Sequence, residues 1–270
     1  MKHIIPLLTI LFLVLLMFGC ARGPYAATNK SYKQQAKAYA KIIARQPVSD
    51  SLTTGPWVGT TNFSLRKPNF VIIHHTAQKS CEQTLKTFTM PRTSVSAHYV
   101  ICEDGTVYHM LNDYLRAWHA GVGKWGNDAD INSSSIGIEI DNDGFEPFTD
   151  AQINSLLTVL GGLKKTYGIP TANFIGHADI APTRKNDPNV HFPWKMLADN
   201  GFGLWWKDTT SVVVPQNFDN LVALRVIGYD MRDTTAVIKT FKRKYLQQEN
   251  DSLITEPDRK ILYTLYNQFR

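Results

Sequence analysis

The stretch that sets the fold is Asn69-Phe70-Val71-Ile72-Ile73-His74-His75-Thr76. Its run of β-branched and aromatic residues predicts a buried strand in the middle of a sheet. The run ends in two imidazoles, and open α/β sheets place their functional sites at the carboxyl ends of the strands. Because successive side chains of a strand point to opposite faces, only one of His74 and His75 is expected to face such a site.

A second stretch, from Gly176 to Pro188, has the composition of a functional loop. It follows a short predicted strand at residues 173–175, shows no helical or strand periodicity and contains two prolines. Its titratable and charged side chains are His177, Asp179, Arg184, Lys185 and Asp187. A loop with so many of these groups more often carries chemistry than packing, and a solvated loop without a function is the alternative.

Two further segments predict strands. Residues 96–102 and 106–110 flank Asp104-Gly105, which supplies the positive φ of a tight hairpin turn. Residues 136–140 are apolar except for one acid, Glu139. An unpaired acid inside an apolar strand is costly, so this carboxylate is expected either to have a structural partner or to face a site.

Helices are predicted between and after the strands. Residues 82–89 suggest a short helix, and Thr149 opens a capping box for a longer one that runs to Tyr167 and stops at Gly168. The segment 215–270 predicts three short amphipathic helices. We therefore expect an α/β protein with a central mixed β-sheet flanked by helices, plus a small C-terminal three-helix domain.

The composition and charge of the chain indicate which kinds of binding partner to expect. The chain has 270 residues, 43% of them hydrophobic and 19% charged, as is usual for a globular protein. Its net charge of +6 suits an anionic partner such as a cell-wall polymer or a membrane surface. The basic residues are scattered and form no nucleic-acid-binding motif, so no nucleic-acid partner is expected.

The N-terminus is typical of an exported protein. A basic start precedes an apolar run at residues 4–18, too short for a comfortable membrane span, and Gly19-Cys20 follows. This ending resembles a lipobox, which implies acylation of Cys20. We expect a lipoprotein signal peptide at 1–20, a tether with a short helix (Ser31 to Arg45) at 21–55, and anchoring to the bacterial outer membrane, facing the periplasm. A plain signal peptide or an anchor helix is the alternative.

Five segments in order resemble the zinc-dependent N-acetylmuramoyl-L-alanine amidases, which share a fold with the peptidoglycan recognition proteins. They are Ile73-His74-His75-Thr76-Ala77, Val95-Ser96-Ala97-His98-Tyr99, Trp118-His119-Ala120-Gly121, Ser135-Ile136-Gly137-Ile138-Glu139 and Gly176 to Pro188. The likeness covers residues 69–194 and is closest to lipoprotein amidases that carry a small peptidoglycan-binding module. It implies hydrolysis of the amide between N-acetylmuramic acid and L-alanine in peptidoglycan or its fragments.

The resemblance also implies roles for individual residues. It assigns three zinc ligands, His74, His177 and Asp187, and two catalytic residues, Glu139 and Lys185. The residues themselves agree, since two imidazoles and a carboxylate are a plausible set for a catalytic zinc with one open position. Asp187 as a turn acid before a proline, and Lys185 as a solvated lysine, are the alternatives. His75 is then a packed histidine behind the site.

The sequence leaves open which residues contact the substrate. Four residues are candidates for binding glycan and peptide: His98, Trp118, His119 and Trp125. A histidine within a strand or a tryptophan often belongs to the core, which is the alternative.

Two cysteines, Cys81 and Cys102, remain besides the predicted acylation site Cys20. An exported protein could bridge them, but we expect two unpaired thiols because Cys81 begins a helix and Cys102 ends a strand.

The expected domains are a zinc amidase domain at 56–210 and a helical domain at 215–270 that resembles a peptidoglycan-binding module. A helical brace on the amidase domain is the alternative for the second. The expected partners are peptidoglycan or a muropeptide and, through the lipid anchor, a membrane, and the protein is expected to be a monomer. A non-catalytic lipoprotein that recognises peptidoglycan or tethers the envelope is the alternative function. The sequence leaves open whether intact wall or an anhydro-muropeptide is the substrate.

Overall fold

The predicted buried run forms β1 (Phe70–His75), which lies between two parallel neighbours, β4 (Ser135–Ile140) and β5 (Phe174–Gly176). On the far side of β4, β2 (Tyr99–Ile101) pairs parallel with β4 and antiparallel with β3 (Val107–His109). The strand order is therefore β3-β2-β4-β1-β5. This mixed sheet and the hairpin between β2 and β3 confirm the prediction.

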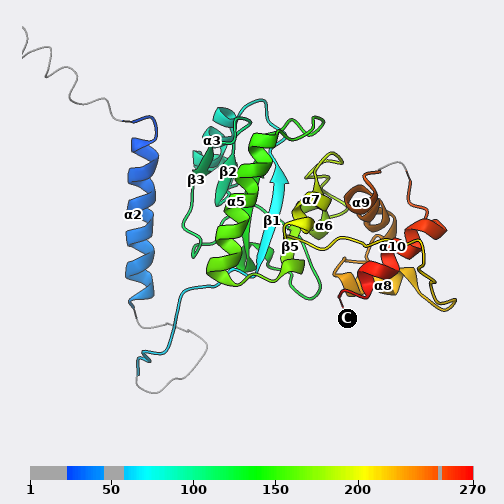
Figure 1. Cartoon of the computed structure of the whole chain (residues 1–270). Helices are drawn as coiled ribbons and strands as arrows, with labels where there is room; N and C mark the ends of the chain where they lie inside the picture. The colour runs from blue at the N-terminus through cyan, green and yellow to red at the C-terminus, as the bar shows by residue number, and fades with distance from the viewer. Residues whose placement is uncertain (1–22, 46–57, 249–250, 270) are drawn as a thin grey trace, which may run out of the picture. The chain divides into compact units, whose positions relative to one another are not determined.

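The computed structural model describes residues 23–45, 58–248 and 251–269 (Figure 1). They divide into two compact units, Met1–Phe63 and Ser64–Arg270. The first contains α2 (Ala26–Ile43), which begins five residues before the predicted start at Ser31. The predicted signal peptide and Cys20 lie outside the described residues. None of the helices in the described parts of the chain has the length and apolar content to cross a membrane.

One face of the sheet is covered by α5 (Asp150–Tyr167), which lies in front of the strands in Figure 1. The helix begins with the predicted capping box at Thr149 and stops at Gly168, whose φ is +65°. Alternate residues of the strands pack against it, because successive side chains point to opposite faces. This core includes Val71, Ile73, Ile138, Leu156 and Leu160.

A disulfide joins the hairpin to a helix and corrects one prediction. Cys81 is the first residue of α3 (Cys81–Thr89), and Cys102 directly follows β2. Since α3 packs beside the end of β2, the two α-carbons are 5.2 Å apart, within bridging range. The prediction of two unpaired thiols is therefore wrong. Cys81 and Cys102 are 21 residues apart in the sequence, and the loop that the disulfide closes contains α3.

The remaining short elements lie in the segments that connect the strands and the longer helices. Two are 3-10 turns and three are short helices. They are Pro91–Thr93, Thr171–Asn173, α4 (Ile131–Ser134), α6 (His177–Ile180) and α7 (Trp194–Asp199). The helical turn α6 occupies the start of residues 176–188, for which a loop without helical periodicity is predicted.

The three predicted C-terminal helices are present as α8 (Asn220–Ile227), α9 (Thr234–Leu246) and α10 (Glu256–Tyr266). They share a hydrophobic core with the face of the sheet opposite α5. That core includes Ile72, Ile175, Leu224, Phe241 and Leu262. The segments predicted as separate domains at 56–210 and 215–270 are therefore packed as parts of one compact unit.

A buried ion pair ties α9 to the loop that follows β5. Lys244 Nζ lies 2.6 Å from Asp179 Oδ2, and the two side chains are 5% and 2% exposed. The Tyr229 hydroxyl donates to Asp179 Oδ1 over 2.8 Å, and the backbone N–H of Gly176 donates to Asp179 Oδ2 over 2.8 Å. Asp179 therefore braces this loop, and the C-terminal helices brace the sheet domain.

We expect Lys244→Ala to lower the free energy of unfolding by about 3–5 kcal/mol, because it leaves the buried carboxylate of Asp179 without its cation. Lys239→Ala removes an exposed lysine from the same helix and is the matched control, with an expected change within about 0.5 kcal/mol. Urea unfolding followed by tryptophan fluorescence measures both. Equal effects of the two variants would contradict the bracing role.

Candidate active site

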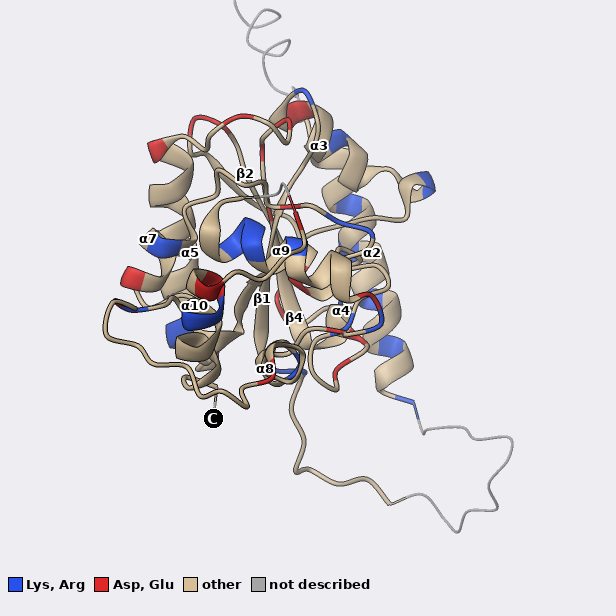
Figure 2. Cartoon of the chain, turned by 90° about the vertical axis from the view of Figure 1, so that its right-hand side faces the viewer, with Lys and Arg blue, Asp and Glu red and all other residues tan. Residues whose placement is uncertain are grey.

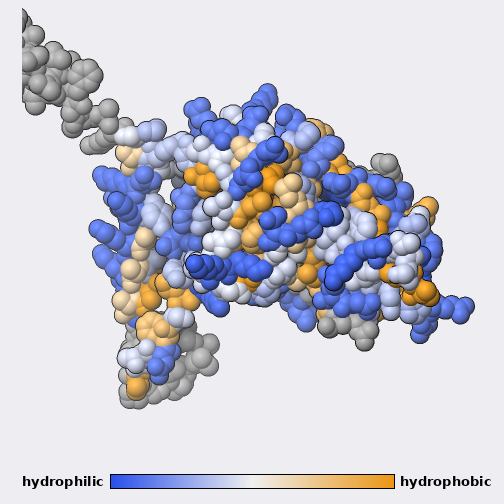
Figure 3. Space-filling model, viewed as in Figure 1, coloured by the Kyte–Doolittle hydropathy of each residue, from blue (hydrophilic) through white to orange (hydrophobic). Residues whose placement is uncertain are grey.

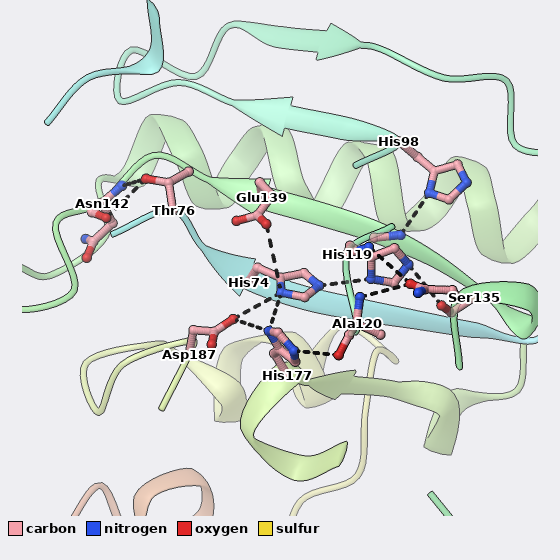
Figure 4. A network of polar contacts seen from close by, with 12 residues as sticks. His74, Thr76, His98, His119, Ala120, Ser135, Glu139, Asn142, His177 and Asp187 are labelled. Carbon is pink, nitrogen blue, oxygen red and sulfur yellow. Dashed lines mark hydrogen bonds and ion pairs between the residues drawn. The ribbon is translucent and has the colours of Figure 1, made fainter. Parts of the chain in front are cut away.

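Three side chains converge where β1 ends (Figure 4). His74 is on β1, His177 is the first residue of α6 directly after β5, and Asp187 lies ten residues further on. The Nδ1 atoms of the two histidines are 2.9 Å apart, and each is 3.0 Å from Asp187 Oδ2. Their exposed fractions are 1%, 3% and 6%, so the group is shielded from water.

A chain of hydrogen bonds fixes the proton on His74. The Ser135 hydroxyl donates to the carbonyl of Ile131, so Ser135 Oγ accepts from His119 Nε2 over 3.1 Å. His119 Nδ1 then carries a lone pair and accepts from His74 Nε2 over 3.1 Å. His74 therefore presents a bare Nδ1. Burial and the neighbouring His177 lower the pKa of His74 to about 4, so the ring is neutral at pH 7.

His177 is oriented in the same way by a backbone carbonyl. Its Nε2 donates to Ala120 O over 3.0 Å, and a carbonyl oxygen can only accept. The lone pair of a neutral ring is then on Nδ1. The carbonyl is held in place because the side-chain oxygen of Asn132 accepts from the backbone N–H groups of His119 and Ala120 over 3.1 and 2.9 Å.

Three bare acceptors therefore face one another. Two lone pairs and a carboxylate oxygen this close together repel one another unless a cation lies between them. A tetrahedral divalent ion at about 2.1 Å from each atom holds such atoms about 3.4 Å apart. In the described part of the chain, His74, His177 and Asp187 come together with all three side chains buried. This set fits a metal ion.

Glu139 stands beside this group without joining it. It is the partner of His74 on the parallel strand β4, so the two side chains lie on the same face of the sheet. Glu139 Oε1 is 4.0 Å from His74 Nδ1. Burial, followed by the charge of Asp187, raises the pKa of Glu139 well above its ordinary value. A carboxyl group with a raised pKa can accept and return a proton near neutral pH.

Lys185 supplies positive charge at the edge of the site. Its side chain is partly exposed, and its backbone N–H donates to Ala181 O over 3.0 Å at the end of α6. Its charge opposes the rise in the pKa of Glu139 and contributes to the lowered pKa of His74. A fixed cation at this position can stabilise negative charge that develops on a substrate oxygen.

Residues 64–190 match the family model of the N-acetylmuramoyl-L-alanine amidases. Over 151 residues the chain is 35% identical to the N-acetylmuramoyl-L-alanine amidase AmiD of Escherichia coli, a match that covers 50% of this chain and 54% of AmiD. The chain thus spans about half the length of the curated relatives it matches. The matched segment contains His74, Glu139, His177, Lys185 and Asp187.

Two solved structures share the fold. AmpDh3 from Pseudomonas aeruginosa superimposes with a TM-score of 0.68 at 26% identity and covers 81% of this chain and 98% of AmpDh3. AmpDh3 has also been solved with an anhydromuramic pentapeptide. AmiD, solved with the substrate anhydro-N-acetylmuramic acid-L-Ala-D-gamma-Glu-L-Lys, gives a TM-score of 0.66 at 26% identity and covers 78% of this chain and 93% of that one. The shared fold therefore extends beyond residues 64–190.

Of the four predicted substrate-binding residues, His98 and Trp125 are corrected by the structure. His98 is fully buried, accepts from the backbone N–H of Gly137 and donates to Leu115 O, so it has no surface to offer a ligand. Trp125 is 7% exposed and packs against the turn between α8 and α9, with its ring 5.0 Å from that of Tyr229. Both belong to the interior, the alternative that the sequence left open.

The other two lie next to the site. His119 is 8% exposed and orients His74, as described above. Trp118, which precedes His119 in the sequence, is 51% exposed, and its backbone N–H donates to Ser96 Oγ over 2.9 Å. A substrate contact by Trp118 stays a prediction.

His75 has the supporting position expected from strand alternation. It points away from His74, is 6% exposed, and its Nδ1 accepts from the backbone N–H of Asn189 over 3.1 Å. Asn189 is two residues beyond Asp187, so this bond helps to fix the ligand loop. Burial is the main cause of a lowered pKa of His75, which keeps the ring neutral and able to accept.

Sequence reasoning missed the residues that hold the ligands in place. Asn132 and Ser135 are buried polar residues whose partners lie on other segments, and the carbonyl of Ala120 has no signature in the sequence. Gly137 is a further case, because the His119 ring lies directly over it. A polar, small-residue pattern at alternate positions of the strand, Ser135, Gly137 and Glu139, was the one available signal.

Gly137→Ala tests this support. Its methyl group would lie 2.3 Å from the His119 ring and displace it from His74 Nε2. We expect affinity for a divalent metal to fall about 10- to 100-fold, the usual cost of losing such a partner. Competition with a chromophoric chelator measures this affinity.

Gly161→Ala is the control, because a methyl group there meets no atom within 4 Å. It should leave metal affinity unchanged. Unchanged affinity in a folded Gly137→Ala protein would show that His119 does not support the ligand.

Proposed function

We propose that this chain is a zinc-dependent N-acetylmuramoyl-L-alanine amidase, which hydrolyses the amide between N-acetylmuramic acid and L-alanine in peptidoglycan or its fragments. The observation that carries the proposal is the convergence of His74, His177 and Asp187 beside a proton-accepting carboxyl group, Glu139. The family match over residues 64–190 supports the choice of bond.

The donor set favours zinc. Two imidazoles and one carboxylate are among the common ligand sets of catalytic zinc, which keeps a further position for water or substrate. When bound, zinc lowers the pKa of a coordinated water from about 16 to about 7 and so supplies a nucleophile at neutral pH. That change in pKa is on the order of 12 kcal/mol, more than a lone histidine base offers.

The side chains around the ligands then perform the proton transfers. Glu139 takes the proton of the attacking water on a carboxylate oxygen and returns it to the nitrogen of the leaving L-alanine. Lys185 stabilises the negative charge that develops on the carbonyl oxygen of the scissile amide. Burial of the site strengthens both effects, because it excludes competing water.

Soluble anhydro-muropeptides are the substrates we propose first. AmiD and AmpDh3, which share the fold, have been solved with ligands of this class. We also propose that the chain is a monomer. Its first twenty residues suggest a lipoprotein that is exported, acylated at Cys20 and anchored to the outer membrane on the periplasmic side. Glycan binding by the C-terminal helices, next to their bracing role, remains part of the proposal.

Purified protein incubated with an anhydro-muropeptide tests the reaction. Mass spectrometry should find a free lactyl sugar and a peptide that begins with L-alanine. A chelator should abolish cleavage and zinc should restore it. Cleavage that resists the chelator would refute the metal role, and binding of the muropeptide without cleavage would favour the alternative of a recognition protein.

Two variants separate metal binding from proton transfer. Asp187→Ala should lose both the metal and the activity. Glu139→Gln should keep the metal and lose about 10²- to 10⁴-fold in kcat, because the amide cannot take up the proton. Glu82→Gln, on the exposed surface of α3, is the control and should match the unaltered protein. A Glu139→Gln protein with near-normal kcat would exclude Glu139 as the base.

A further inference from the structure

Helix α2 carries a basic stripe. Its sequence places lysines at 30, 33, 37 and 41, all of them exposed, and Arg45 follows the helix. At about 100° per residue, these four lysines fall within an arc of about 80°. The helix contains no acidic residue, and Figure 2 shows basic positions recurring along it without an acidic one. This face therefore suits an anionic partner.

A second stripe on α2 is less polar. Tyr32, Tyr39 and Ile43 are 37%, 44% and 69% exposed, and at about 100° per residue they fall within an arc of about 40°. Its centre lies about 140° around the helix from that of the lysines. Figure 3 shows hydrophilic side chains along one edge of α2 with less polar ones beside them. None of the residues of α2, all of which are described, is buried.

By itself a helix of this length gains little stability in water, so a partner that covers the less polar stripe would stabilise it. A partner with an apolar layer beneath an anionic surface matches both stripes at once. Tyrosine is enriched at membrane–water interfaces, and lysine reaches from there to the headgroups. Helices with these two faces lie in the plane of a bilayer surface.

We propose that α2 binds the surface of an anionic phospholipid bilayer, with Tyr32, Tyr39 and Ile43 turned toward the acyl chains and the lysines toward the headgroup phosphates. The predicted acylation site, Cys20, lies six residues before Ala26, which is at most about 22 Å of extended chain. An acyl group there would hold the first turn of α2 at the membrane. The helix then adds a second membrane contact next to the lipid anchor.

Vesicle co-sedimentation of the chain from Ala21 onward, without the acyl group, tests the proposal. The protein should bind vesicles of phosphatidylglycerol and phosphatidylcholine, and bind pure phosphatidylcholine much more weakly. Replacing all four lysines of α2 by glutamine should weaken binding at least about tenfold. Replacing Tyr32, Tyr39 and Ile43 by serine should weaken it as well, since the apolar contact is lost.

The matched control removes the same number of charges from the second unit. Lys79, Lys86, Lys165 and Lys207 are exposed there, and their replacement by glutamine should leave vesicle binding close to normal. Equal losses in the control and in the α2 variant would overturn the proposal, because net charge alone would then explain binding. Hydrolysis of a soluble muropeptide should be the same in all variants, so failure of the proposed activity is distinguishable from failure of this inference.

Evidence for either of two other partners of α2 would also overturn the proposal of membrane binding. If the lysines of α2 bind peptidoglycan instead, their replacement lowers sedimentation with purified sacculi and leaves vesicle binding unchanged. If α2 packs against the second unit, the serine variant lowers the free energy of unfolding of that unit. Unchanged sacculus binding and unchanged unfolding, together with lost vesicle binding, are the results we expect.

Discussion

Electrostatic repulsion among three acceptors is the constraint on which the site depends. Two imidazole Nδ1 atoms and a carboxylate oxygen come within 3.0 Å of one another in the interior, where little water screens them. The arrangement persists because each imidazole is held by a hydrogen bond at its other nitrogen. His74 is held by His119 and His177 by the carbonyl of Ala120. The partners that hold a ligand therefore matter almost as much as the ligand itself.

The sheet produces this arrangement through two simple properties. Parallel pairing of β1 with β4 places Glu139 beside His74, and pairing with β5 brings in the residue that follows it, His177. Alternation of side chains then assigns one face to the core under α5 and the other to the site. The C-terminal helices complete the second face and hold the ligand loop through Asp179. Site and brace are thus parts of one packed unit.

The sequence predicted those features that depend on local pattern. The buried strand before His74, the acid within β4 and the long capped helix all follow from periodicity and capping chemistry, and the structure confirms them. Contacts between distant segments were less accessible. The pairing of Cys81 with Cys102 depends on how α3 packs beside β2, and the burial of Trp125 depends on a turn about a hundred residues later. Likewise, nothing local marks Asn132 as the residue that holds the backbone around Ala120.

Anomalous X-ray scattering at the zinc absorption edge, from crystals of the zinc-loaded protein, tests the central claim most directly. We expect one strong peak about 2.0–2.2 Å from the Nδ1 atoms of His74 and His177 and from Asp187 Oδ2, with Glu139 beyond bonding distance. A peak bound through either Nε2 atom would contradict it, because the hydrogen bonds to His119 and Ala120 would then have to be absent. The absence of any peak at these residues would contradict the metal centre itself.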